Sequence, residues 1–245
     1  MLVKDRTEGK VLVLGHRGAP LKEIENTVAS FRRAIADGAD GVELDVRVTK
    51  DHKLVVSHDN LLKRVYGADL KVEESTLPEI RKVAPEVAEL REVFDALGPV
   101  FYDIEIKADA PLDYNKEVVT LLGEELGRRP ELREKIMLSS FNPFAMRQAQ
   151  KVIRYPYPRA LIYEGENIPK PCRHGLPRIL FHCSVLKPKF NIATREKQSK
   201  KKYPVVPWTV DTEEVLMEMI ALKSPIIITN DSEKIVRILQ EQGLR

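Results

Sequence analysis

Two histidines and the residues beside them could carry out acid–base chemistry on a charged substrate. His16 is followed at once by Arg17, and His58 is followed at once by Asp59. An unperturbed imidazole titrates near pH ~6.5, so either histidine could give or accept a proton at neutral pH. The planar guanidinium of Arg17 can grip a phosphate through two parallel N–H donors. These residue types favour catalysis on an anionic substrate over a role in the core.

Carboxylates within two strand-like runs predict a metal site. Side chains of a strand alternate between its faces, so Glu43 and Asp45 share one face of the run 41–46. The run 101–107 repeats the pattern and places on one face Asp103, Glu105 and Lys107. Buried carboxylates are costly unless they are paired or bind a cation, and oxygen ligands favour Mg, Ca or Mn. The alternative is a pair of edge strands with one face in water.

The elements that must position these residues alternate between strand and helix. Amphipathic helical patterns separate eight apolar runs, at residues 11–14, 41–48 (with 54–57 as a short extension), 100–107, 135–139, 160–163, 178–182, 205–210 and 225–229. The first helix has a candidate N-cap at Asn26. This alternation is typical of a (β/α)8 barrel or an open doubly wound sheet. Charged residues end several strands, which favours the TIM barrel, because its active site lies at the C-terminal ends of the strands.

Length and composition indicate one domain with ordinary globular content. The 245 residues, 43% of them hydrophobic, suit a single domain over 1–245, with an insertion at about 59–85 after the second strand. A net charge of +3 from 40 basic and 37 acidic residues gives no argument for nucleic acid as a partner. No apolar run approaches the roughly 20 residues of a membrane helix. Together with an N-terminus that lacks a signal peptide, this predicts a soluble cytoplasmic protein without stable membrane insertion.

Cys172 and Cys183 are the two cysteines of the sequence. Their spacing matches neither a zinc motif nor a redox motif. We expect two inert thiols in a reducing compartment.

Several short motifs together resemble a known family. They occur in the family's order at 16–18 (His-Arg-Gly), 25–27 (Glu-Asn-Thr), 43–45 (Glu-Leu-Asp), 58–59 (His-Asp), 104–107 (Ile-Glu-Ile-Lys), 139–141 (Ser-Ser-Phe) and 208–210 (Trp-Thr-Val). Over nearly the whole chain the sequence resembles the glycerophosphodiester phosphodiesterases. The resemblance implies a TIM barrel that hydrolyses small glycerophosphodiesters to sn-glycerol 3-phosphate and an alcohol, in glycerophospholipid breakdown.

The resemblance also implies roles for eight residues. They are an acid–base pair, His16 and His58; ligands of one divalent cation (Mg, Ca or Mn), Glu43, Asp45 and Glu105; phosphate contacts, Arg17 and Lys107; and a tryptophan beside the glycerol, Trp208. By the same resemblance, the 2-hydroxyl of the substrate attacks first and water then opens the cyclic phosphate.

The sequence departs from the family pattern at three positions. Asp103 stands where the family usually has Asn, Asp211 also stands in place of Asn, and Asn230 stands in place of Asp. None of these changes removes a proposed catalytic group. They leave the charge of the pocket and the preferred substrate open.

Two other functions fit the same residues. One is a lysophospholipase-D-like cleavage of lysophospholipids, which would need an apolar mouth; the insertion could supply part of it through Leu61, Leu62, Val65 and Tyr66. The other is a catalytically silent phosphate-binding protein. That function predicts the loss of a histidine or a metal ligand, and none is missing.

Overall fold

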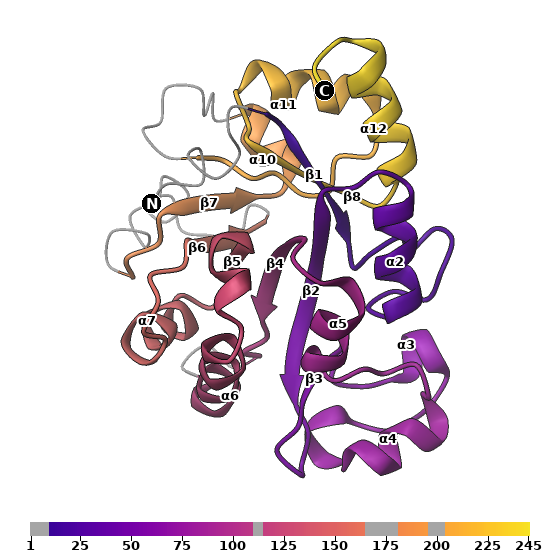
Figure 1. Cartoon of the computed structure of the whole chain (residues 1–245), viewed down its shortest axis with the longest axis vertical. Coiled ribbons are helices and arrows are strands. Elements are labelled where there is room, and N and C mark those ends of the chain that lie inside the picture. The colour runs from indigo at the N-terminus through magenta and orange to yellow at the C-terminus, as the bar shows by residue number, and fades with distance from the viewer. Residues whose placement is uncertain (1–9, 110–114, 165–180, 196–203) are drawn as a thin grey trace.

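A curled parallel sheet forms the centre of the molecule (Figure 1). The computed structural model describes residues 10–109, 115–164, 181–195 and 204–245. In this part of the chain, parallel strands follow the spatial order β7-β6-β5-β4-β2-β1-β8. The strands are β1 (Leu12–His16), β2 (Gly41–Val48), β4 (Phe101–Ile106), β5 (Ile136–Ser140), β6 (Arg159–Tyr163), β7 (Val185–Pro188) and β8 (Ile226–Thr229). Most of their residues are buried, as expected for strands covered on both faces.

Residues 205–210 close the sheet between β7 and β8. Two isolated bridges join this segment to β7 and to the residue after it. On the other side, the Val210 N–H donates to the carbonyl of Ile228 in β8 at 2.9 Å. Pro207 has no N–H, so a regular ladder cannot run through the segment. The predicted (β/α)8 barrel is confirmed, but the prediction of a regular strand at 205–210 is wrong.

The strand predicted at 178–182 is misplaced. Residues 178–180 lie outside the described part of the chain, and Phe181 and His182 form a turn. The strand at this place in the barrel is β7, which pairs in parallel with β6. Sequence reasoning missed it because Lys187 and Pro188 interrupt the apolar run. The short extension after β2 does form: β3 (Leu54–Val56) pairs antiparallel to it.

Helices lie outside the sheet and bury their apolar faces against it (Figure 1). They are α2 (Val28–Ala36), α5 (Leu90–Leu97), α6 (Lys116–Gly127), α7 (Pro143–Val152), α10 (Phe190–Arg195), α11 (Glu213–Ala221) and α12 (Ser232–Glu241). The N-cap of α2 is Thr27, whose side chain accepts from the Ser30 N–H, so the predicted cap at Asn26 is wrong. Asn26 instead takes a positive φ of 59° and reaches into the barrel. No helix in the described ranges is long and apolar enough to cross a membrane.

The segment predicted as an insertion contains three short helices. They are α3 (Lys63–Tyr66), the 3-10 helix η1 (Val72–Glu74) and α4 (Leu77–Val83). Leu62, Val72 and Ile80 belong to a small apolar core of its own. The segment lies beyond β3, near the C-terminal end of β2 (Figure 1). It is therefore placed to contact the C-terminal ends of the strands.

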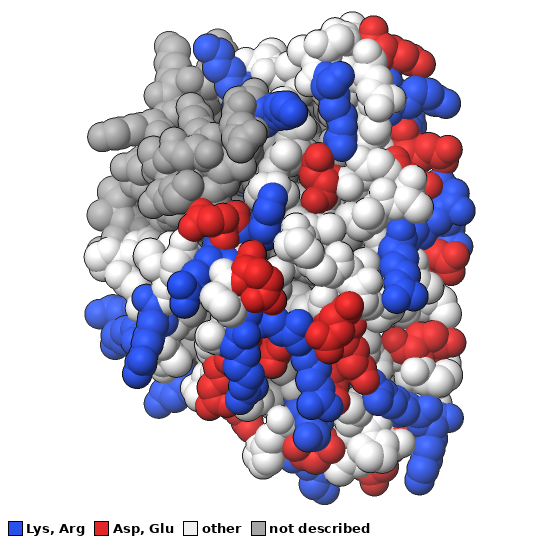
Figure 2. All heavy atoms as spheres, in the orientation of Figure 1, with Lys and Arg blue, Asp and Glu red and all other residues white. Residues whose placement is uncertain are grey.

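Charged side chains are interspersed by sign on the face shown in Figure 2. Among the described residues visible there, Lys and Arg alternate with Asp and Glu and form no broad patch of one sign. Cys183 is buried, whereas Cys172 falls outside the described residues.

Gly41→Ala is expected to lower the free energy of unfolding by about 1–3 kcal/mol, as overpacking of a tight contact does. Gly41 begins β2, and a Cβ there would lie 1.9 Å from the carbonyl oxygen of Phe101 in β4. Chemical denaturation measures the effect. Gly127→Ala is the control, because no atom lies within 4 Å of that Cβ position. Equal midpoints for the two variants would contradict the prediction.

Candidate active site

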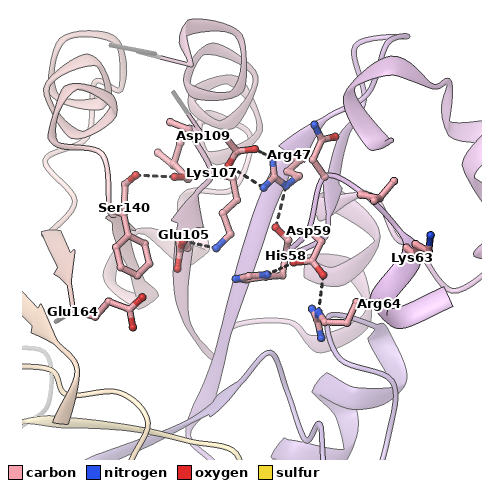
Figure 3. Close-up of a pocket in the computed structure, with 15 residues that line it drawn as sticks. Arg47, His58, Asp59, Lys63, Arg64, Glu105, Lys107, Asp109, Ser140 and Glu164 are labelled. Carbon is pink, nitrogen blue, oxygen red and sulfur yellow. Dashed lines mark hydrogen bonds and ion pairs between the residues drawn. The ribbon is translucent and has the colours of Figure 1, made fainter. Parts of the chain in front are cut away.

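The predicted site residues meet at one end of the barrel. A cavity of about 280 Å³ lies at the C-terminal ends of the strands, and six of the eight line it: His16, Arg17, Glu43, His58, Glu105 and Trp208. Asp45 lies against the same carboxylates, and Lys107 lines an adjoining cavity of about 770 Å³ (Figure 3). The two cavities share Phe141 and Glu164 as well as His58 and Glu105.

Three buried carboxylates form a potential metal site. One oxygen from each of Glu43, Asp45 and Glu105 lies within 4.8 Å of the others. The strand register explains the grouping, because Asp45 in β2 stands beside Glu105 in β4. The three residues are at most 5% exposed. An all-oxygen donor set of this kind fits a hard divalent cation.

Lys107 neutralises part of this cluster. Its Nζ lies 2.8 Å from Asp45 Oδ1 and 2.5 Å from Glu105 Oε1. Burial acts against ionisation of Asp45, but the charges of Lys107, His58 and Arg17 hold its pKa well below the usual range. Burial raises the pKa of Glu105 to about 7, although Lys107 acts in the opposite direction. Lys107 was predicted to contact phosphate, and here it lies between the carboxylates.

His16 is held by Asn230, which follows β8, and by Asp211, which follows the segment 205–210 and contacts Asn230. Its Nδ1 lies 2.8 Å from Asn230 Oδ1. The side-chain amide of Asn230 donates to Asp211 Oδ2 at 2.8 Å, which fixes its oxygen toward the histidine. His16 therefore donates from Nδ1, and its Nε2 faces Glu43 at 4.0 Å. Two departures from the family pattern are thus reciprocal: the Asn and the Asp have exchanged places.

His58 follows β3 and is held by its neighbour. Its Nδ1 lies 2.6 Å from Asp59 Oδ1, so Asp59 orients the ring. Arg47 donates from Nε to the main-chain carbonyl of His58 at 3.0 Å (Figure 3). Burial lowers the pKa of His58, and Asp45 offsets this only in part. Both histidines thus have Nδ1 engaged, which leaves Nε2 for a substrate.

A tight turn presents Arg17 to the cavity. Arg17 has a positive φ of 54° and Gly18 one of 91°, and a Cβ on Gly18 would lie 2.3 Å from Ser30 Oγ. Glycine is therefore required at the third position of the motif. Arg17 Nη1 donates to Glu25 at 2.9 Å, and its Nε lies 3.6 Å from Asp45.

Sequence reasoning missed Lys187, which lies on the floor of the cavity. Its Nζ is 2.8 Å from Asp103 Oδ2 and 3.3 Å from Glu43 Oε1. Lys187 is 2% exposed and Asp103 is fully buried. Burial opposes the charge, but Asp103 and Glu43 raise the pKa of Lys187. The pairing accounts for the third departure, since an aspartate at 103 has a cation beside it.

Trp208 and Phe141 form an aromatic wall of the cavity. Their rings meet edge to face with centroids 5.7 Å apart. The indole N–H of Trp208 donates to the carbonyl of Lys187 at 3.2 Å, which anchors the ring to β7. An apolar wall opposite charged residues suits a small substrate with one polar and one carbon-rich side.

Comparison with known proteins identifies relatives over the whole barrel. The model of the glycerophosphoryl diester phosphodiesterase family matches residues 16–234. A glycerophosphodiester phosphodiesterase of Caldanaerobacter subterraneus subsp. tengcongensis is 32% identical over 252 residues, 96% of this chain and 100% of that protein. A human lysophospholipase D is 29% identical over 137 residues, which cover 45% of this chain and 44% of that protein.

Solved structures share the fold. A glycerophosphodiester phosphodiesterase of Thermotoga maritima has a TM-score of 0.77 and 29% identity, over 93% of this chain and 98% of that one. An Oleispira antarctica phosphodiesterase, solved with the product sn-glycerol-3-phosphate, has a TM-score of 0.81 and 21% identity, over 96% and 99% of the chains. The resemblance stated from the motifs is therefore confirmed, and the chain belongs to the glycerophosphoryl diester phosphodiesterase family, a family of phosphoric diester hydrolases.

Proposed function

We propose that the protein hydrolyses soluble glycerophosphodiesters to sn-glycerol 3-phosphate and an alcohol. The observation that carries the proposal is a single cavity of about 280 Å³ that brings together two histidines, Arg17 and two carboxylates of the buried triad. The full-length similarity to a glycerophosphodiester phosphodiesterase supports the substrate class.

The carboxylate triad would hold one divalent cation, Mg, Ca or Mn. Its members Glu43, Asp45 and Glu105 offer oxygens at a spacing that such an ion can bridge. When bound, the ion supplies Lewis-acid stabilisation of a phosphoryl oxygen and orients the glycerol hydroxyls.

Arg17 and Lys107 would bind the phosphodiester. Arg17 can grip two phosphate oxygens with its planar fork, and its contact with Glu25 fixes the direction of that fork. Lys107 now lies against Asp45 and Glu105, so a cation bound there would compete for the same oxygens and free the ammonium for phosphate. The glycerol would lie along Trp208 at the aromatic wall.

The two histidines would exchange protons with the substrate in two steps. In the first, one histidine takes the proton of the 2-hydroxyl as its oxygen bonds to phosphorus. The other histidine gives a proton to the oxygen of the departing alcohol as the bond between that oxygen and phosphorus breaks. In the second step the roles reverse: a water attacks phosphorus, and the 2-oxygen leaves with a proton. Each acid or base contributes about 10²–10⁴-fold.

Lysophospholipids are the second candidate substrate. The lining of the adjoining cavity of about 770 Å³ indicates whether an acyl chain would fit there. The partial similarity to a human lysophospholipase D favours it. Of the apolar residues expected at the mouth, Leu61 lines the large cavity, whereas Leu62 is buried in the core of the insertion. Most other lining groups of this cavity are charged or polar (Figure 3). The charged groups of the lining favour a soluble head group over an acyl chain, although carbon atoms make up most of the exposed lining.

Release of glycerol 3-phosphate from glycerophosphocholine tests the proposal. Purified protein is assayed with Mg, Mn, Ca or EDTA, and lysophosphatidylcholine is assayed in parallel. We expect metal-dependent release from the soluble diester and at least tenfold lower kcat/KM on the lysolipid. Folded protein that is inactive on the diester with every metal would refute the proposal, and activity on the lysolipid alone would establish the second candidate.

A further inference from the structure

Arg64 on α3 contacts two acidic residues that hold the active site. Its Nη1 and Nη2 donate to the two oxygens of Glu25 at 2.8 and 2.6 Å. Its Nε donates to Asp59 Oδ2 at 2.6 Å (Figure 3). Three N–H groups of one guanidinium are thus engaged on two carboxylates. Only the fork of an arginine has this geometry.

The two carboxylates contact two different residues of the proposed active site. The Oε1 atom of Glu25 also accepts from Arg17, at 2.9 Å. The Oδ1 atom of Asp59 lies 2.6 Å from His58 Nδ1. Arg64 is therefore linked through one carboxylate to Arg17, the proposed phosphate contact, and through another to His58, one of the two proposed acid–base groups.

The charge state of the network supports a permanent link. Burial alone would raise the pKa of Glu25, but its contacts with Arg64 and Arg17 lower that pKa below the usual value. Contacts with His58 and Arg64 likewise lower the pKa of Asp59 against the effect of burial. Both acids are thus ionised at neutral pH and accept from a guanidinium that is always charged.

A second arginine links the same histidine to the insertion. Arg47 is 4% exposed and donates to the main-chain carbonyl of His58. It also donates from Nη1 to Glu73 on η1 at 2.8 Å and binds Asp109 through two bonds of 2.8 and 3.1 Å. Two helices of the insertion, α3 and η1, therefore contribute to holding His58.

A half-exposed ion pair could be of little consequence by itself. The Arg64 side chain is 50% exposed, and isolated surface pairs contribute about 0–1 kcal/mol. Arg64 differs because its bonds are bidentate and belong to a network whose other members are partly buried: Glu25 is 15% and Asp59 28% exposed. Its expected effect is on the geometry of the site, since misplacing a catalytic group by about 1 Å can cost 10²-fold in rate.

We propose that Arg64 is a positioning residue that fixes Arg17 and His58 at the same time, so that the insertion is a working part of the active site. The inference rests on the proposed function for the roles of those two residues. According to the proposal, α3 fixes the position of Arg17, which binds phosphate, relative to that of His58, which transfers a proton.

The test compares Arg64→Met with Arg64→Lys and with a matched control. For Arg64→Met we expect kcat on glycerophosphocholine to fall about 10–100-fold and KM to rise, because both sides of the cavity loosen. Arg64→Lys keeps the charge but loses the fork, so it should recover only part of kcat. Arg81→Met is the control, because Arg81 on α4 of the insertion pairs with Glu92 on α5 and lines neither cavity. Its activity should be unchanged.

A double-mutant cycle separates positioning from general loosening. If Arg64 acts on His58 through Asp59, then Arg64→Met combined with Asp59→Asn should lower kcat by clearly less than the product of the two single losses, because only the branch through Glu25 remains to be lost. Losses that multiply, or a kcat of Arg64→Met within twofold of the unaltered protein, would overturn the proposal. Should Arg64→Met fail to fold, the same criteria apply to Arg64→Lys.

A spectroscopic measurement makes the test independent of the substrate. In the unaltered protein, the ¹⁵N shifts of His58 should report a proton held on Nδ1 by Asp59. In Arg64→Met they should move toward a mixture of tautomers, and unchanged shifts would refute the link. If the protein proves inactive on glycerophosphodiesters while the shifts do move, the proposed function fails but the positioning role of Arg64 stands.

Discussion

His16→Ala is expected to lower kcat on glycerophosphocholine by about 10²–10⁴-fold, the usual contribution of a general acid or base. His16 ends β1 and lines the cavity of about 280 Å³, with Nδ1 bound to Asn230 and Nε2 turned toward Glu43. In the described part of the structure, no neighbouring side chain is placed to take over the proton transfer of His16. KM should change much less, because Arg17 and the aromatic wall remain. Steady-state kinetics at saturating metal measure both constants.

His52→Ala is the matched control for this variant. His52 is 74% exposed and pairs with Glu117 away from both cavities, so its removal should leave kcat unchanged. Circular dichroism should show both variants folded. Activity of His16→Ala within threefold of the unaltered protein would remove His16 from the acid–base pair, whatever the rate of the control.

Alternation within two strands was enough to predict the centre of the site. In β2 and β4 the period of two forces carboxylates onto one face, and neighbouring parallel strands bring these faces together. The local pattern therefore grouped Glu43 and Asp45 with Asp103 and Glu105, and the family resemblance singled out Glu43, Asp45 and Glu105 as the ligand set. The residue types pointed to His16 and His58 as acid–base groups, and the family resemblance added the role of Trp208.

The residues that hold the site were not predictable in the same way. Lys187 and the proline after it interrupt a short apolar run. The partner of Lys187, Asp103, belongs to a different strand. Arg64 lies in a helix of only four residues, which is too short for an apolar pattern to indicate which way its side chain points. Each gains its role from contacts far apart in sequence, for which one sequence carries no signal. Asn26 resembled a helix cap because caps and loop ligands use the same residue types.

Asp45→Asn is expected to abolish activity to the level of the EDTA-treated protein. The carboxylate of Asp45 is 1% exposed, belongs to the triad, and also contacts Lys107 and Arg17. An amide would offer a neutral oxygen where a divalent cation needs charge, so metal affinity should fall together with kcat. Isothermal titration with Mn measures the affinity directly, without relying on turnover. Asp95→Asn is the control, since Asp95 pairs with Arg129 at the surface.

Metal binding should also weaken as the pH falls, with a sign fixed by Glu105. Burial raises the pKa of this carboxyl to about 7 in the metal-free site. Below that pH it holds a proton that a cation must displace, and above it the carboxylate is free to bind. We therefore expect Mn affinity to fall as the pH drops below about 7, where binding releases the proton of Glu105 to the buffer. Affinity that is constant from pH 8 to pH 5.5, or retained in Asp45→Asn, would show that the triad is not the metal site.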